Sequence, residues 1–331
     1  MSVLFVLLDG MEDHPHPDLD GRKPYEVARM PFIRSTTRRT LFTDGRGYTH
    51  LFLHEFLSGR PPEMSRAAIE AMGLGLSMDG DRAAFRMSPA RVKDGIIEWA
   101  YGLDDMEDRL KGSMMGNLHM LDDLSPEIRF FIDGKSILTM DMEPVPDLPG
   151  PPVSAPCRPI PDPLKSYIDK VSVDTGGLTS YPWGCGRVGA RFQPFPCIKY
   201  MTSISNGPTA LGVAASLGHD IRWVDDIEER FILAREELRN GHVLLHIDEI
   251  DEYSHQKDHR KKIDVLELTD SLMRKYFSDH ADIIYFTDHG TSCITGEHIL
   301  MTVPLWTSLE PDVPNNEHVP LKEVIEKLLG T

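Results

Sequence analysis

The fold is decided by a short apolar run near the beginning of the chain, Val3-Leu4-Phe5-Val6-Leu7-Leu8, which leads directly into Asp9. A continuous run of β-branched and aliphatic residues is typical of a strand that is buried on both faces of a parallel sheet. Asp9 then lies at the carboxyl end of this strand, where ligands bind in open α/β sheets. The run therefore predicts a buried sheet and also the edge at which a site would form.

The same pattern returns twice toward the C-terminus. Residues 242–247 form an apolar run that leads toward Asp251, and residues 282–287 lead directly into Asp288 and His289. Between these runs, residues 208–217, 227–239 and 261–277 show the spacing of apolar residues that is typical of amphipathic helices. Alternating strands and helices predict an α/β fold, in which a mostly parallel sheet carries helices on both faces.

The middle of the chain has a different pattern. Short apolar runs at residues 83–87, 95–99 and 129–132 are followed by a proline-rich stretch from residue 144 to 163. Such a stretch favours extended geometry and suits a connection at a domain boundary. We therefore expect a core domain made of residues 1–76 and 178–331, with an inserted α+β lobe over residues 77–177 that serves as a substrate or lid domain.

The composition limits the partners that the protein can bind. There are 35 Lys and Arg residues against 52 Asp and Glu residues, and the resulting net charge of −17 opposes binding to nucleic acid or to an anionic membrane. The apolar run before Asp9 is too short for a signal sequence or a membrane span. No C-x-x-C pair is present, so reduced cysteines and a cytoplasmic location are expected. The oligomeric state stays open.

Acidic and imidazole side chains follow all three predicted strands, and together they resemble the ligands of a metal site. Asp251 and His255 are four residues apart, so on a helical turn they would face the same side. Two divalent cations about 3.5–4 Å apart need such a mixture of carboxylates and imidazoles for phosphoryl or sulfuryl chemistry. The candidate ligands are Asp9, Asp251, His255, Asp288, His289 and His298. The alternative is that each is an ordinary surface group.

The expected division of these ligands places Asp251, His255 and His298 on one cation. Asp9, Asp288 and His289 would then hold the other. Sites that mix oxygen and nitrogen ligands suit manganese, zinc, cobalt or magnesium, and the sequence does not choose among these metals.

Six segments, which together span nearly the whole chain, carry a resemblance to a known family: Leu8–Asp13, Ser65–Gly75, Gly80–Arg86, Trp183–Gly186, Asp251–His255 and Thr287–His298. In this order they resemble the alkaline phosphatase superfamily and, more narrowly, archaeal-type cofactor-independent phosphoglycerate mutase. The resemblance implies an alkaline phosphatase-like core, two divalent metal ions and a small phosphorylated substrate.

The nucleophile departs from the pattern of this family. There, a serine that opens a helix after the second strand becomes phosphorylated, but gapless alignment places Gly47 at that position here. Thr49 is the best substitute, since Ser58-Gly59 and Pro62 follow it at the distances found in related members of the superfamily. The resemblance thus implies that Thr49 is the catalytic nucleophile. The alternative is that Thr49 only caps a helix.

The substrate-binding arginines are a second departure. The family carries an arginine-rich segment soon after its Phe-Arg motif, whereas residues 95–102 contain no basic side chain here. Carboxylate and phosphate groups are best held by bidentate arginines. The remaining candidates for this role are Arg66, Arg86, Arg187 and Arg191.

The resemblance implies a mutase that interconverts 3-phosphoglycerate and 2-phosphoglycerate, with the inserted lobe closing over the site to exclude water. Two alternatives stay open. The missing arginine segment favours a metal-dependent phosphomonoesterase or phosphodiesterase. The glycine at the serine position favours a metal-binding paralogue without catalytic activity.

Overall fold

A computed structural model of the chain describes residues 2–151 and 153–330. It divides into two compact units, the first made of Met1–Pro62 with Arg191–Thr331 and the second of Glu63–Ala190. The second unit is longer at both ends than the expected lobe of residues 77–177, because α4 (Arg66–Gly73) packs on β3 (Ala83–Lys93) and β8 (Leu178–Gly186). The role of this unit as a substrate or lid domain stays a prediction.

The first unit is built on a seven-stranded sheet with the order β10-β9-β11-β1-β12-β15-β2. The five strands from β10 to β12 are parallel, and β15 is antiparallel to both of its neighbours. This confirms the mostly parallel sheet, and the three apolar runs form its adjacent strands β11, β1 and β12. The strand bounds are β1 Leu4–Leu8, β2 Arg39–Asp44, β9 Met201–Ser205, β10 Asp220–Trp223, β11 His242–Ile247, β12 Ile283–Phe286 and β15 Thr302–Thr307.

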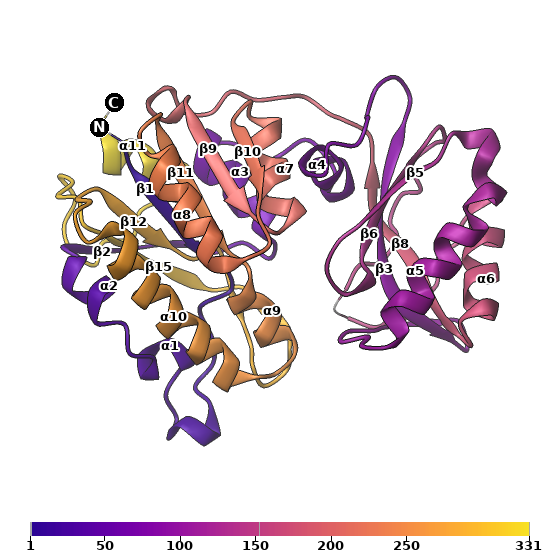
Figure 1. The fold of residues 1–331 in the computed structure, drawn as a ribbon, viewed down its shortest axis with the longest axis horizontal. Helices are drawn as coiled ribbons and strands as arrows, with labels where there is room; N and C mark the ends of the chain where they lie inside the picture. Colours follow the sequence, from indigo (N-terminus) through magenta and orange to yellow (C-terminus); the bar gives the residue numbers. More distant parts are fainter. Residues whose placement is uncertain (1, 152, 331) are drawn as a thin grey trace. The chain divides into compact units, whose positions relative to one another are not determined.

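Helices cover both faces of this sheet, as expected (Figure 1). Successive side chains of a strand point to opposite faces. Leu4, Val6 and Leu8 accordingly pack with buried residues of α2 (Pro31–Thr36), α8 (Ile227–Glu237) and α10 (His259–Phe277). On the other face, the ring of Phe56 in α3 (Thr49–Ser58) lies 6.4 Å from Phe5 and 4.5 Å from Phe286. The α7 helix (Pro208–Ser216) packs beside α3 and on β9.

Two helices of the first unit, α8 and α10, begin at acidic side chains that cap them. Asp226 accepts a hydrogen bond of 2.9 Å from the backbone N–H of Glu229 at the start of α8, and Asp258 accepts one of 3.0 Å from Lys261 at the start of α10. An N-cap side chain satisfies an amide that has no partner within the helix. This explains why α10 begins before residue 261, where the apolar periodicity begins.

The second unit is an antiparallel sheet with helices packed against it. The strand order is β5-β6-β3-β4-β7, and β8 pairs with β3. Phe85, Met87 and Leu138 share one apolar core with Leu110 of α5 (Met106–Asn117) and Tyr167 of α6 (Leu164–Asp174). The short apolar runs of the middle region thus form strands. Their bounds are β4 Ile96–Trp99, β5 Glu127–Phe130, β6 Ser136–Met140 and β7 Ala155–Pro156.

Two further features of the described residues bear on the expectations from composition. None of their helices combines the length and the apolar character that crossing a membrane requires. Cys157, Cys185, Cys197 and Cys293 are all free thiols.

Candidate metal centre

The carboxyl ends of the central strands bring the six predicted ligands together within the first unit. Asp9 follows β1, Asp288 and His289 follow β12, and Asp251 and His255 lie on α9 (Glu249–His255), which follows β11. His298 returns to the same place because β14 (His298–Ile299) pairs with β13 (Gly290–Thr291), with His298 opposite Thr291.

Asp251, His255 and His298 form the first group. The Nε2 atom of His255 lies 3.1 Å from Asp251 Oδ2 and 3.1 Å from His298 Nε2, while His298 Nε2 lies 3.9 Å from Asp251 Oδ2. Each histidine donates its Nδ1–H to a backbone carbonyl, His255 to Gly296 at 2.7 Å and His298 to Gly47 at 2.8 Å. This is the usual arrangement of metal-binding histidines, since it leaves the Nε2 lone pairs facing the ligand position.

The electrostatics of this group favour a positive charge between its atoms. Burial alone would raise the pKa of Asp251, but His255 and His298 outweigh burial and hold that pKa well below its usual range. Burial would lower the pKa of His255, whereas the adjacent Asp251 carboxylate raises it to about 9. The Asp251 carboxylate is therefore ionised at neutral pH, as a metal ligand must be.

Asp9, Asp288 and His289 form the second group. His289 Nε2 lies 3.5 Å from Asp9 Oδ1 and 3.2 Å from Asp288 Oδ2. Both of these carboxylate oxygens are buried, and neither has a hydrogen-bond partner among the described residues. Burial, followed by the charges of Asp288 and Asp251, raises the pKa of Asp9, and burial lowers the pKa of His289 to about 4. Two buried oxygens without donors beside a neutral imidazole fit a divalent cation.

The two groups adjoin each other. The ligand atoms of Asp9, Asp251 and His289 all lie within 4.8 Å of one another. The Thr291 hydroxyl donates to Asp251 and lies 3.1 Å from His289 Nδ1, so one side chain contacts both groups. Gly10 is required between them, because its φ is +59° and a Cβ atom would lie 2.4 Å from Asp251 Oδ1. The residues present therefore fit two neighbouring cations.

Thr49 lies beside the second group. Its Oγ1 is 3.5 Å from Asp9 Oδ2 and 3.4 Å from His289 Nε2. Thr49 is the first residue of α3 and Tyr48 is the N-cap, so the alternative that Thr49 only caps the helix is wrong. At Gly47, a Cβ atom would meet no heavy atom of the described residues within 4 Å. The Gly47 carbonyl accepts from His298, so both positions lie at the candidate ligands, and of the two only Thr49 carries a hydroxyl.

His246, in β11, contacts the candidate ligand Asp9. It is buried, with Nε2 2.7 Å from Asp9 Oδ2 and Nδ1 2.7 Å from Ser205 Oγ. Burial lowers the pKa of His246 to about 3, so the ring is neutral. If the Ser205 hydroxyl donates to Nδ1, the Nε2–H donates to Asp9 Oδ2 and leaves Oδ1 for a cation. Asp248 lies 3.7 Å from the same Nε2.

The four predicted substrate arginines are not gathered in one cluster. In the second unit, Arg66 Nε donates to Glu70 at 2.8 Å, Arg86 forms an ion pair with the same carboxylate, and both guanidinium groups lie over the ring of Trp183. Arg187 forms an ion pair of 2.8 Å with Glu143. Arg191 belongs to the first unit and is exposed.

A third group of possible ligands, His16, Asp18 and His259, lies apart from these residues. Its ligand atoms are within 4.8 Å of one another, and the two imidazole rings are 4.1 Å apart. However, the backbone N–H of Asp18 donates to His16 Nδ1 at 3.2 Å. A neutral imidazole has a single lone pair for bonding, so this hydrogen bond occupies the lone pair and the other nitrogen carries the proton. His16 therefore has no lone pair left for a cation in this arrangement.

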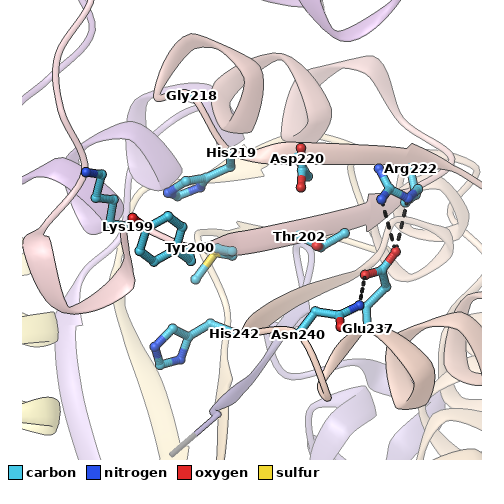
Figure 2. Close-up of a pocket in the computed structure, with 12 residues that line it drawn as sticks. Lys199, Tyr200, Thr202, Gly218, His219, Asp220, Arg222, Glu237, Asn240 and His242 are labelled. Carbon is cyan, nitrogen blue, oxygen red and sulfur yellow. Dashed lines mark hydrogen bonds and ion pairs between the residues drawn. The ribbon is translucent and has the colours of Figure 1, made fainter.

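Figure 2 shows a separate depression of about 470 Å³ at the amino ends of β9, β10 and β11, the strand ends opposite to Asp9. Three of the polar side chains that line it are paired with one another. Arg222 lies 3.1 Å from Glu237 Oε1, and Asn240 donates to Glu237 Oε2 at 3.1 Å. None of the predicted site residues lines this depression.

Comparisons with known proteins show what the chain is similar to. Residues 210–328 match a family model described as the Metalloenzyme superfamily. A 2,3-bisphosphoglycerate-independent phosphoglycerate mutase of Picrophilus torridus is 22% identical over an alignment of 372 positions, and the alignment covers 93% of this chain and 88% of that protein. The mutase of Pyrococcus abyssi is 30% identical over 103 residues, or 28% of this chain, and this match spans a quarter (25%) of the length of that relative.

Two solved structures share the fold. The PH0037 protein from Pyrococcus horikoshii has a TM-score of 0.70 at 17% identity, with 99% of this chain and 97% of that chain covered. Cofactor-independent phosphoglycerate mutase from Thermoplasma acidophilum has a TM-score of 0.56 at 18% identity, with 99% of both chains covered. Together with the family match over residues 210–328, these findings confirm the predicted resemblance of the chain to the alkaline phosphatase-like metalloenzyme superfamily.

Proposed function

We propose that the chain is a phosphoryl-transfer enzyme that uses two divalent metal ions, and that it interconverts 3-phosphoglycerate and 2-phosphoglycerate. The observation that carries this proposal is the position of Thr49, whose Oγ1 lies 3.5 Å from Asp9 Oδ2 and 3.4 Å from His289 Nε2. A hydroxyl beside candidate metal ligands is the arrangement that activates a nucleophile.

In this proposal, Asp251, His255 and His298 hold one cation. Asp9, Asp288 and His289 hold the second cation. His246 orients the Asp9 carboxylate through the 2.7 Å contact between its Nε2 and Asp9 Oδ2. When bound, the cations supply charge stabilisation for the transferring phosphoryl group. The metal is manganese, zinc, cobalt or magnesium.

Thr49 carries the phosphoryl group between the two hydroxyls of glycerate. A P–O bond to Thr49 Oγ1 forms as the bond to the first substrate oxygen breaks, and the hydroxyl proton of Thr49 moves to that leaving oxygen. The reverse step delivers the phosphoryl group to the other hydroxyl of glycerate, whose proton returns to Thr49. Thr49 begins the ten-residue helix α3, so the positive end of the helix dipole stabilises the negative charge of the phosphoryl group. Water must be kept out, because hydrolysis would end the cycle.

Arg66 and Arg86 are the first candidates for holding the substrate anion. Both guanidinium groups contact the Glu70 carboxylate and lie over the ring of Trp183, so two bidentate donors lie side by side there. Arg187 is neutralised by Glu143. We keep Arg187 and the exposed Arg191 as secondary candidates.

A small phosphorylated substrate and a cytoplasmic location belong to the same proposal. The four free cysteines support the location.

A phosphomonoesterase or phosphodiesterase is the second candidate. Residues 95–102 form β4 and its flanking turns and contain no Lys or Arg, where the mutase family carries arginines. An enzyme that lacks these groups would hold glycerate less firmly while the phosphoryl group rests on Thr49. Release of inorganic phosphate would then compete with return to glycerate.

The two candidates are separated by incubating metal-loaded protein with 3-phosphoglycerate and enolase. Phosphoenolpyruvate formation that is lost in Thr49→Ala supports the mutase, whereas release of phosphate alone supports the hydrolase. Ser58→Ala is a matched control, because it removes a hydroxyl from the same helix that contacts His54 O rather than the ligands. Metal binding without either product would identify the catalytically silent alternative.

A further inference from the structure

Lys262, in the first turn of α10, is fully buried and yet is not one of the candidate ligands. Its Nζ lies within hydrogen-bonding distance of four oxygens, Gly10 O at 2.9 Å, Thr291 O at 3.0 Å, Asp13 Oδ2 at 3.1 Å and Glu12 O at 3.3 Å, which share its three N–H donors. Removing an ammonium group from water is costly unless it is paired and hydrogen-bonded. Four oxygen acceptors around a single ammonium group meet that requirement.

The acceptors lie on two loops that follow the candidate ligands. Gly10, Glu12 and Asp13 come directly after Asp9, and Thr291 comes shortly after His289. The Asp13 side chain is also fully buried, and its carboxylate accepts the backbone N–H of Cys293 at 3.2 Å as well as the Lys262 ammonium. Lys262 and Asp13 therefore join the loop after β1 to the loop after β12.

Two of the residues that Lys262 contacts, Gly10 and Thr291, also contact candidate ligands directly. Gly10 accepts from Lys262 through its carbonyl and donates its N–H to Asp288 Oδ1 at 3.2 Å. Thr291 likewise accepts from Lys262 through its carbonyl, while its hydroxyl contacts Asp251 and His289. A shift of the ammonium group would therefore move groups that contact ligands of both cations.

We infer that Lys262 and Asp13 are positioning residues that set the spacing of the two ligand-bearing loops. This inference rests on the metal centre of the proposed function. The competing explanation is that the pair only stabilises the fold. Replacing both members of a buried ion pair is often neutral for stability, whereas removing one member is costly, so stability and metal binding can be separated by mutation.

The test is calorimetric titration of the metal-free protein with Mn²⁺ and, separately, with Zn²⁺. In Lys262→Met, the dissociation constant should rise about 10- to 100-fold, as is typical when a group that orients metal ligands is removed. Lys262→Met combined with Asp13→Asn should recover thermal stability relative to the single variant but keep the weakened metal binding. Lys261→Met is a matched control, since that side chain is 55% exposed, and it should bind metal like wild type.

Wild-type dissociation constants in folded Lys262→Met would overturn the positioning role and leave the proposed function standing. If Lys262→Met does not fold, the uncharged double variant decides by the same criterion. Recovery of both stability and metal affinity in the double variant would show that the pair is merely structural. Wild-type protein that binds neither cation would overturn the metal centre itself, and the positioning role with it.

Discussion

Replacing Asp9 by Asn should stabilise the metal-free protein while removing one metal site. Asp9 Oδ1 and Asp288 Oδ2 are buried without hydrogen-bond partners among the described residues. A buried polar group without a partner costs roughly 1–3 kcal/mol. The Asn carbonyl can still accept from His246, and its amide can donate to Asp288. We therefore expect metal-free Asp9→Asn to be more stable than wild type by about 1–3 kcal/mol, where each kcal/mol corresponds to roughly 2–4 °C in Tm.

Bound metal should make wild type more stable than Asp9→Asn. A cation at 100 times its dissociation constant stabilises a folded protein by about 2.7 kcal/mol, and wild type should gain this at the Asp9 site while Asp9→Asn should not. Differential scanning calorimetry with EDTA and with Mn²⁺ measures both effects, and Asp20→Asn, whose carboxylate is 96% exposed, is the control. A metal-free variant that is less stable than wild type, or one that keeps the full metal-dependent gain, would refute this reasoning.

Two further substitutions test other parts of the account. His246→Ala should weaken metal binding about 10- to 100-fold, because Asp9 loses its hydrogen-bond donor, and His246→Gln should restore part of the lost affinity. Titration with Mn²⁺ measures both variants. Unchanged affinity in the alanine variant would contradict the role of His246. Burial lowers the pKa of His219 from 6.5 to about 4, so the unfolded chain takes up the proton first and stability should fall as the pH drops through this range. The expected loss in the free energy of unfolding is roughly 3 kcal/mol, at about 1.4 kcal/mol per pKa unit. Urea unfolding at both ends of this pH range should show that the stability of His219→Gln depends less on pH than the stability of wild type. An equal pH dependence in the two proteins would exclude His219 as the cause.

The sequence is sufficient to predict the core of the fold, because each central strand is a continuous apolar run that ends in a potential ligand. Asp9 and Asp288 could be placed at one sheet edge for this reason. His298 is different, because it reaches the site through the two-residue strands β13 and β14, which are too short to leave a pattern. It could be included only because it follows His289 closely in the chain.

The residues that support the ligands could not be predicted in the same way. The role of His246 depends on β11 lying next to β1, and the order of strands in a sheet is not written in the periodicity of any one strand. Lys262 occupies a polar position in an amphipathic helix, and its partners are mostly backbone carbonyls of two distant loops. Only the folded chain shows that such a lysine is buried.

The central claim is that these residues hold two cations beside Thr49, and a crystal structure of metal-loaded protein with anomalous scattering tests it most directly. We expect two peaks about 3.5–4 Å apart. Asp251, His255 and His298 should bind one ion, while Asp9, Asp288 and His289 bind the other, with Thr49 Oγ1 about 2.0–2.2 Å from it. A single peak, or peaks away from these side chains, would contradict the two-metal centre, and a Thr49 hydroxyl turned away from both ions would contradict its role as nucleophile.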